Sequence, residues 1–208
     1  MCKINKKNEL IVVGEKVYIG LPNGKYATAI YKTFTNLHAD EAYWYEGSNG
    51  YVVATIEGQL IGLHEYIAGK RPGLMVDHKD RDKLNNTDEN LRVCTAAENA
   101  RNTSTARNNK LGIKGIKQDA DGKYDIHVWP DKKGRFIGRT SNLLVAKLVY
   151  NIVSKWYYGD FAYQHDIPDY ELTRDILVEA KEMTDHFANK EANNNREVPH
   201  MLGSFYWC

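Results

Sequence analysis

The sequence predicts an α+β fold with two small domains and a C-terminal extension, and three observations lead to this prediction. Short runs of β-branched and aromatic residues alternate with turn signals such as Asn23-Gly24 and Asp121-Gly122. Thr95-Ala96-Ala97-Glu98 has the form of a helix capping box. A stretch with apolar residues at helical spacing, 141–158, follows three strand-like runs.

The first part of the chain reads as short strands joined by tight turns. Strands are expected at 10–13, 16–19, 51–56 and 59–61, with a turn at Glu57-Gly58 and a short helix near 63–68 that Gly69 ends. This lead-in contains few residues that suggest chemistry. The exception is His64, which stands at the start of the expected helix.

Residues 76–102 read as a strand, a polar loop, a second strand and a helix. Val76 begins the first strand, so Asp77 and His78 are expected on opposite faces. Asn90 stands at the entrance of the second strand, 91–94, and Asn99 lies in the first turns of the helix that Thr95 caps. A carboxylate and an amide can bind a hard cation through oxygen, and an imidazole can take a proton from water. These are the groups that phosphodiester cleavage requires.

This stretch resembles the HNH nucleases, in particular the subgroup of phage and intron homing endonucleases. The matching features are Val-Asp-His at 76–78, Asp-Glu-Asn-Leu-Arg at 88–92 and Thr-x-x-Glu-Asn at 95–99. The resemblance implies a ββα-metal (HNH) nuclease domain that uses Mg²⁺ or Mn²⁺. It implies that Asp77 and Asn99 are metal ligands, that His78 is the general base, and that Asn90 orients His78.

The chain departs from these relatives at two positions. Leu84-Asn85-Asn86-Thr87 stands where relatives often carry Asp-Asn-Arg, so an arginine that contacts phosphate is missing. Relatives usually follow the histidine at position 64 with arginine, whereas this chain has Glu65. We therefore assign no catalytic role to His64 from the sequence. The resemblance also extends to the lead-in, for which a supporting layer and direct contact with DNA are both open.

Residues 111–162 form the second predicted domain. Three strands are expected at 112–117, 123–129 and 135–138, followed by a helix that Ser141 caps and Gly159 ends. In the second strand Tyr124, Ile126 and Val128 would face the helix, which leaves Asp125, His127 and Trp129 on the outer face.

This second region resembles the DNA-binding domain of plant ethylene-response transcription factors, a three-stranded antiparallel sheet plus a helix. Lys-Gly-Ile-Lys at 114–117, Gly-Lys-Tyr at 122–124 and Phe-Ile-Gly at 136–138 match its landmarks. The family lays its sheet in the major groove of double-stranded DNA, which makes Lys114, Lys117, Trp129 and Arg135 candidate contacts. Because lysine cannot bond guanine in the two-point manner of arginine, sequence reading through Lys114 and Lys117 would be weak.

Charge is unevenly distributed although the whole chain carries only +1. Residues 70–147 contain 17 Lys and Arg against 10 Asp and Glu, whereas residues 160–208 contain 4 against 10. The positive segment is where phosphate should bind. It includes Arg101 and a polar linker, 103–110, whose Arg107 and Lys110 could follow a DNA backbone. The acidic extension, 163–208, is predicted to hold a helix from about Asp169 and could bind a protein partner or cover the basic face.

Other features of the sequence argue against a membrane-spanning protein, a secreted protein and a zinc clip. No apolar run is long enough to span a membrane, and the polar N-terminus predicts no signal peptide. The three cysteines, Cys2, Cys94 and Cys208, form no Cys-x-x-Cys zinc clip. These features indicate a cytoplasmic protein, in the host cell if a phage encodes it. The oligomeric state cannot be read from the sequence.

The expected organisation is a nuclease domain over 1–102, a linker over 103–110, a DNA-binding domain over 111–162 and the extension. The expected function is a metal-dependent homing-type DNA endonuclease that nicks or cuts both strands. Two alternatives remain open at this point. One is an HNH scaffold that binds DNA without cutting it, and the other is a nuclease that acts on RNA or branched nucleic acid.

Overall fold

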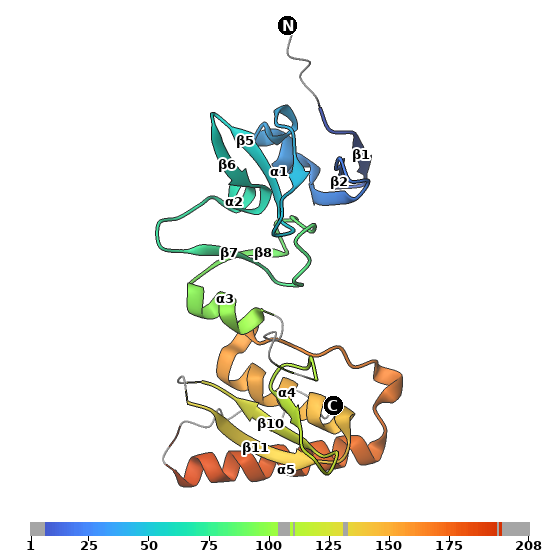
Figure 1. Ribbon diagram of the computed structural model, residues 1–208, viewed down its shortest axis with the longest axis vertical. Helices are drawn as coiled ribbons and strands as arrows, with labels where there is room; N and C mark the ends of the chain where they lie inside the picture. Colours follow the sequence, from blue (N-terminus) through green and yellow to red (C-terminus); the bar gives the residue numbers. More distant parts are fainter. Residues whose placement is uncertain (1–6, 104–108, 110, 131–132, 195, 197–208) are drawn as a thin grey trace, which may run out of the picture. The chain divides into compact units, whose positions relative to one another are not determined.

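The computed structural model describes residues 7–103, 109, 111–130, 133–194 and 196. The chain divides into two compact units, 1–100 and 101–208, and each is described by itself. Both units combine short antiparallel strands with helices, as Figure 1 shows, which confirms the predicted α+β class.

The first unit begins with two three-stranded antiparallel sheets of strand order β1-β2-β3 and β4-β5-β6. The strands are β1 (Leu10–Val13), β2 (Lys16–Gly20), β3 (Tyr26–Ile30), β4 (Tyr45–Glu46), β5 (Val52–Ile56) and β6 (Gln59–Gly62). The helical elements are α1 (Tyr31–Asn36), the 3-10 turn η1 (Ala39–Glu41) and α2 (Leu63–Ala68). Phe34 and Trp44 are fully buried between the sheets and are the largest side chains of this core.

A strand hairpin and a helix complete the first unit: β7 (Met75–His78), β8 (Leu91–Cys94) and α3 (Ala96–Asn102). The capping box is present. The Glu98 carboxylate accepts a hydrogen bond from the backbone N–H of Thr95 (2.8 Å), and Thr95 Oγ1 accepts one from the N–H of Glu98 (3.2 Å). The predicted order of strand, loop, strand and helix over 76–102 is therefore confirmed.

The second unit contains a three-stranded antiparallel sheet of order β11-β10-β9. Its elements are β9 (Ile116–Gln118), β10 (Tyr124–Val128), β11 (Arg135–Thr140), α4 (Leu143–Tyr158) and the 3-10 turns η2 (Gly159–Phe161) and η3 (Asp169–Glu171). Ile126 and Val128 are buried against α4, as their alternation along the strand predicted. The cap of α4 is Asn142, not Ser141, because the Asn142 side chain accepts the hydrogen bonds from the N–H groups of Leu144 and Val145.

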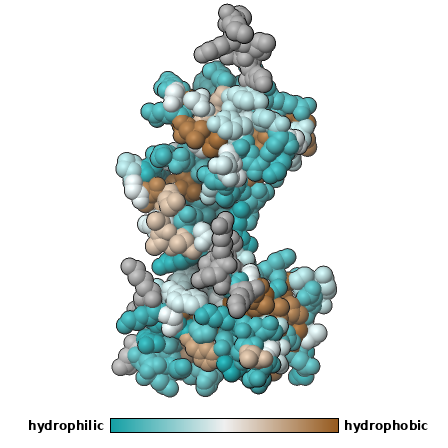
Figure 2. Space-filling model, viewed as in Figure 1, coloured by the Kyte–Doolittle hydropathy of each residue, from teal (hydrophilic) through white to brown (hydrophobic). Residues whose placement is uncertain are grey.

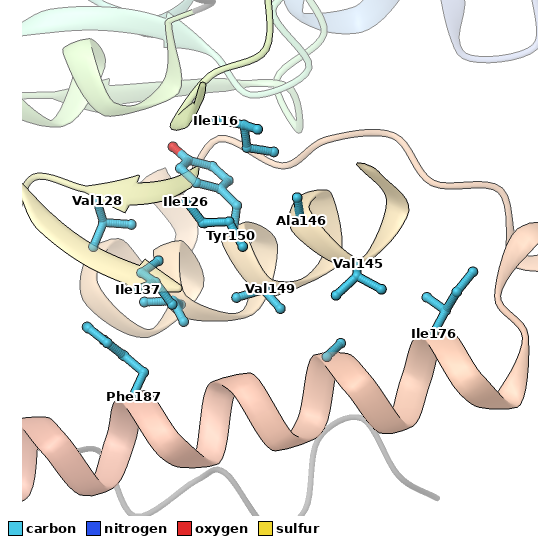
Figure 3. Packing of buried hydrophobic residues seen from close by; sticks show 12 residues of the cluster. Ile116, Ile126, Val128, Ile137, Val145, Ala146, Val149, Tyr150, Ile176 and Phe187 are labelled. Atoms are coloured by element: carbon cyan, nitrogen blue, oxygen red, sulfur yellow. The ribbon is translucent and has the colours of Figure 1, made fainter. Parts of the chain in front are cut away.

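The last helix, α5 (Arg174–Asn193), packs against α4 and β11. Figure 3 shows Ile176 and Phe187 on the side of α5 that faces α4, in the same apolar cluster as Val145 and Val149. Thr173 caps this helix, so it begins five residues later than the sequence predicted, after the η3 turn. The described part of the acidic extension thus lies on the helical side of the sheet and is part of the core of its unit.

Among the described residues, no helix is long and apolar enough to cross a membrane. The face drawn in Figure 2 is mainly hydrophilic, and its apolar surface is divided into separate groups.

Candidate active site around His78

The hairpin β7–β8 presents the two central residues of the predicted site side by side. Asp77 pairs with Arg92 across the hairpin, and His78 pairs with Leu91. Because neighbouring residues of a strand point to opposite faces, Asp77 and His78 serve different sides of the hairpin. Both are buried, with 8% and 3% of their surface exposed.

Asp77 is held by a charged partner on the neighbouring strand. Its Oδ2 accepts hydrogen bonds from Nε (2.9 Å) and Nη2 (2.5 Å) of Arg92. Such charge-assisted bonds orient the carboxylate. The Asp77 carboxylate therefore has a defined position and offers an oxygen ligand for a cation.

Asn99 lies on the same side of the hairpin as Asp77. Its amide donates a long hydrogen bond to the sulfur of Met75 (3.8 Å), and Met75 stands two residues before Asp77 on β7. The structure thus brings both predicted metal ligands to one face. One carboxylate and one amide oxygen fit Mg²⁺ or Mn²⁺, which keep several waters and take further oxygens from a phosphate. No group of three or more His, Cys, Asp or Glu side chains suited to a metal occurs in the described part of the chain.

The His78 imidazole is in contact with Asn86. Its Nε2 lies 3.3 Å from Oδ1 of Asn86. The Asn86 amide nitrogen donates to the carbonyls of Leu84 (3.0 Å) and Lys83 (3.4 Å), so the oxygen of that amide faces the ring. We assign the proton to Nε2 on this basis, which makes Nδ1 the basic nitrogen of His78. Burial lowers the pKa of His78, although the bond to Asn86 and nearby carboxylates, Asp80 first, oppose that shift.

Asn90, which was expected to orient His78, makes its contacts elsewhere. Its amide nitrogen donates to Oδ1 of Asp80 (2.8 Å) and to the carbonyl of Asn85 (2.7 Å), and its Oδ1 accepts from the N–H of Asp80 (3.0 Å). These bonds tie the two ends of the loop between β7 and β8. The expectation is corrected: Asn86 contacts the imidazole, and Asn90 holds the loop that carries Asn86.

The lead-in supports the same loop. Thr28 of β3 donates its N–H to the carbonyl of Leu84 (2.8 Å) and accepts at its own carbonyl from the N–H of Asn86 (2.7 Å). In addition, Thr33 of α1 donates its hydroxyl to Asp88 (3.1 Å). This geometry favours the supporting role of the lead-in, while direct contact of the lead-in with DNA stays a prediction.

Two further rings surround His78 that the sequence did not suggest as partners. The His64 ring centroid lies 5.2 Å and the Tyr51 centroid 5.8 Å from that of His78, and the two are 4.7 Å apart. Burial, followed by the influence of His78, lowers the pKa of His64 to about 4. His64 is therefore neutral at neutral pH. The spacing of these residues in the sequence could not predict the cluster, because its members come from three separate parts of the chain.

In the second unit, two of the predicted nucleic-acid contacts have structural roles. The guanidinium of Arg135 forms an ion pair with Glu191 of α5 and contacts Tyr157 of α4. Its side chain is 16% exposed and lies on the helical side of the sheet, so the assignment of Arg135 to the DNA face is corrected. The Lys114 ammonium donates to the carbonyls of Arg101 (2.7 Å) and Thr103 (2.6 Å), at the end of α3, where a cation is favourable.

The other predicted contacts fall into two groups. Lys117 and Trp129 are exposed, and Trp129 stacks on His127 with a centroid separation of 5.9 Å. Arg101 lies over the Tyr158 ring at 5.1 Å. Arg107 and Lys110 lie outside the described residues.

Two residues of β11 that the sequence analysis did not select also lie on the outer face of the sheet. Phe136 is 44% exposed and meets the His127 ring edge-on at 5.4 Å. Arg139 is half exposed and bonds Asp125 through Nε (2.6 Å). Because the pairing of β10 with β11 shifts register between Ile126 and His127, Phe136 and Arg139 share a face although they are three residues apart, and simple alternation would not have selected both. We call Lys117, His127, Trp129, Phe136 and Arg139 the outer sheet face.

Comparisons with known proteins agree with the geometry of the first unit. Residues 64–101 match the family model described as HNH endonuclease. A curated protein of Acanthamoeba polyphaga mimivirus, described as an uncharacterized HNH endonuclease (L560), is 34% identical over 125 residues. The match covers 57% of this chain and 64% of the relative, so the chain spans less than two thirds of that protein's length. No solved structure matches the chain significantly.

The matched segment runs from α2 through the hairpin β7–β8 into α3, and it contains Asp77, His78 and Asn99 together with the loop that bears Asn86. Motif order, family model and local geometry therefore agree that residues 64–101 are similar to the HNH endonuclease family.

Proposed function

We propose that this protein is a metal-dependent endonuclease that hydrolyses phosphodiester bonds in double-stranded DNA. The observation that carries the proposal is the contact between His78 Nε2 and Asn86 Oδ1, because it leaves Nδ1 as the basic nitrogen of a buried imidazole. That imidazole lies in the same hairpin as an oriented carboxylate, Asp77.

In the proposed reaction, Nδ1 of His78 takes a proton from the water that attacks phosphorus. The imidazolium that forms is stabilised by the Asn86 oxygen and by the carboxylates of Asp80 and Asp77. Asp77 and Asn99 are the side chains that would hold the divalent cation. When bound, Mg²⁺ or Mn²⁺ supplies positive charge to the phosphate oxygens in the transition state.

The outer sheet face of the second unit is proposed to bind the duplex. Lys117 and Arg139 offer cations, and Trp129 and Phe136 offer exposed rings that tolerate any base sequence. The earlier likeness to plant ethylene-response factors supports this choice of face. Without Arg135 on it, the face has fewer cations than the sequence suggested, so recognition would be weakly selective. The homing mode and a phage origin are parts of the same proposal.

A nicking assay tests the proposal. Purified full chain is incubated with supercoiled plasmid and either Mg²⁺, Mn²⁺ or EDTA, and the rate at which open-circular and linear DNA appear is measured. His78→Ala should lower the rate by roughly 10²–10⁴-fold, the usual contribution of a general base, while DNA affinity stays near the original value. His38→Ala is the matched control, since His38 is an exposed histidine of the same unit.

Three outcomes would contradict the proposal in different ways. Equal loss of binding and cleavage in His78→Ala would make His78 structural. Binding without any cleavage would favour an HNH scaffold that only binds DNA. Stronger cleavage of duplex RNA or of a branched junction than of plasmid would move the substrate away from double-stranded DNA.

A further inference from the structure

The proposed base and the two rings beside it come from distant parts of the first unit. Tyr51 stands immediately before β5, His64 is the second residue of α2, and His78 ends β7. The Tyr51–His64 and His64–His78 pairs, at 4.7 and 5.2 Å, make His64 the middle member of this group.

The His64 ring is held by packing. Its Nδ1 is buried and has no hydrogen-bond partner among the described residues. The ring lies directly over the α-carbon of Gly62. A methyl group at that position would come within 2.5 Å of Cε1 and 2.8 Å of Nδ1 of His64. Gly62 also pairs with Val53 in the β5–β6 ladder, so its backbone cannot shift without loss of sheet hydrogen bonds. Only glycine allows the ring to fold back onto β6 in this way.

Tyr51 is connected to the loop that carries Asn86. The Lys83 ammonium lies 4.3 Å from the centre of the Tyr51 ring and donates a hydrogen bond to the carbonyl of Asn49 (2.7 Å). The carbonyl of Lys83 in turn accepts a hydrogen bond from the Asn86 amide (3.4 Å). Asn86, which contacts one nitrogen of His78, and Tyr51, which lies beside the His78 ring, therefore both contact Lys83 of the same loop.

We propose that His64 is a positioning residue for the proposed base, and that its ring, placed by Gly62 and flanked by Tyr51, sets the orientation of the His78 imidazole. A histidine ring rotates broadly about its last side-chain bond, and a hydrogen bond at one nitrogen restrains only one point of it. The contact with His64 provides a second restraint. Because its pKa of about 4 keeps His64 neutral, it adds no charge opposed to proton uptake by His78.

Four variants of the full chain test this role, which rests on the proposed nuclease function. His64→Ala removes the ring, His64→Phe keeps a ring without nitrogens, Gly62→Ala displaces the ring, and His38→Ala is the control. In plasmid nicking, His64→Ala and Gly62→Ala should lower kcat by about 10–10²-fold, the cost of a small misplacement of a reacting group, with KM changed less than about twofold. His64→Phe should stay within about threefold of the original kcat, and His38→Ala should be unchanged.

Two kinetic results would overturn the inference. If His64→Phe is as impaired as His64→Ala, a nitrogen of His64 is needed and packing is not its role. If His64→Ala cleaves at the original rate, the ring has no role in the reaction.

A measurement that needs no activity separates this inference from the proposed function. In NMR spectra of the full chain, the ring protons of His64 and His78 should show a mutual NOE, and the imidazole signals of His78 should move in His64→Ala but not in His38→Ala. Unchanged His78 signals in His64→Ala would overturn the positioning role even if the protein cleaves DNA. Absence of cleavage in the original protein, with the NOE present, would refute the nuclease function and leave the ring contact established.

Discussion

The two units use buried polar side chains in different ways. In the first unit, Asp77, His78, Asn86 and Asn90 are buried in one hairpin and its loop, while the apolar core lies beneath them in the lead-in. In the second unit, the buried Glu191 joins α5 to the sheet through Arg135. Burying a polar group is unfavourable unless it is paired, so each such group needs a specific partner.

The difference indicates where function resides in each unit. The first unit concentrates its buried polar groups at one end of a short hairpin, where they form a site that could act on a substrate. In the second unit, the buried Glu191 and Thr140 join α5 to the sheet, through Arg135 and Glu179. Its candidates for binding are therefore the exposed side chains of the outer sheet face.

The largest effect is expected at the predicted metal ligands. Asp77→Asn and Asn99→Ala should each lower cleavage in Mg²⁺ by at least about 10²-fold, by analogy with the loss of one group that stabilises developing charge. Asp77→Asn is preferred over alanine because it keeps an acceptor for Arg92. High Mn²⁺ should restore part of the rate, since Mn²⁺ binds such sites more tightly than Mg²⁺. Cleavage by either variant at the original rate in low Mg²⁺ would remove that residue from the ligand set.

The next effect concerns the stability of the second unit. Arg135→Ala leaves the carboxylate of Glu191, which is 2% exposed, with one cation fewer, and should cost about 3–5 kcal/mol in urea unfolding. The matched control is Arg139→Ala, whose ion pair with Asp125 is half exposed and should be worth less than about 1 kcal/mol. A stable Arg135→Ala protein that has lost DNA affinity would return Arg135 to the binding surface.

A smaller effect separates the two asparagines of the hairpin loop. Asn90→Ala removes three hydrogen bonds within the loop and should destabilise the first unit by about 1–3 kcal/mol. Asn86→Ala should lower kcat about tenfold or more at a temperature where both variants are fully folded, because the His78 tautomer loses its partner. Thermal unfolding followed by single-turnover nicking measures both quantities. If Asn90→Ala has the larger kinetic effect when folded, the original assignment of Asn90 is restored.

The smallest effect is electrostatic. Lys117→Ala and Arg139→Ala should each reduce the slope of log affinity against log salt by about 0.9 if each cation neutralises one phosphate. Lys114→Ala should leave the slope unchanged, since its ammonium bonds the carbonyls at the end of α3. Salt titrations of the three single variants give this comparison directly, and an unchanged slope in both Lys117 and Arg139 variants would remove the outer sheet face from DNA binding.

Local signals predicted the elements that carry the candidate site better than they predicted the outer sheet face. The capping box, the strand at 91–94 and the alternation of Asp77 with His78 each depend on residues close in sequence, and the structure contains all three. The partner of His78 was missed because Asn86 lies eight positions further along the chain, and only the folded loop decides which asparagine faces the ring.

In the second unit, the prediction for Arg135 was wrong because this side chain pairs with a helix that is distant in the sequence. Arg135 and Glu191 are 56 residues apart, and no local pattern predicts that α5 packs on the helical side of β11. The inward positions of β10 were predicted correctly because the strand period of two is sufficient for them.

The hydrogen bonds between Thr28 and the hairpin loop limit how the proposed nuclease site could be transferred to another protein. The family match begins at residue 64, yet the loop that carries Asn86 is bonded to β3, and Leu84 packs against the core of the lead-in. A fusion that carries only 64–101 would lack these supports and would leave the underside of the loop without a partner. The smallest stretch that keeps the proposed nuclease site together with these supports therefore runs from Asn8, whose side chain bonds Gly20 and Trp44, to the end of α3, and an engineered chimera should be joined outside those limits.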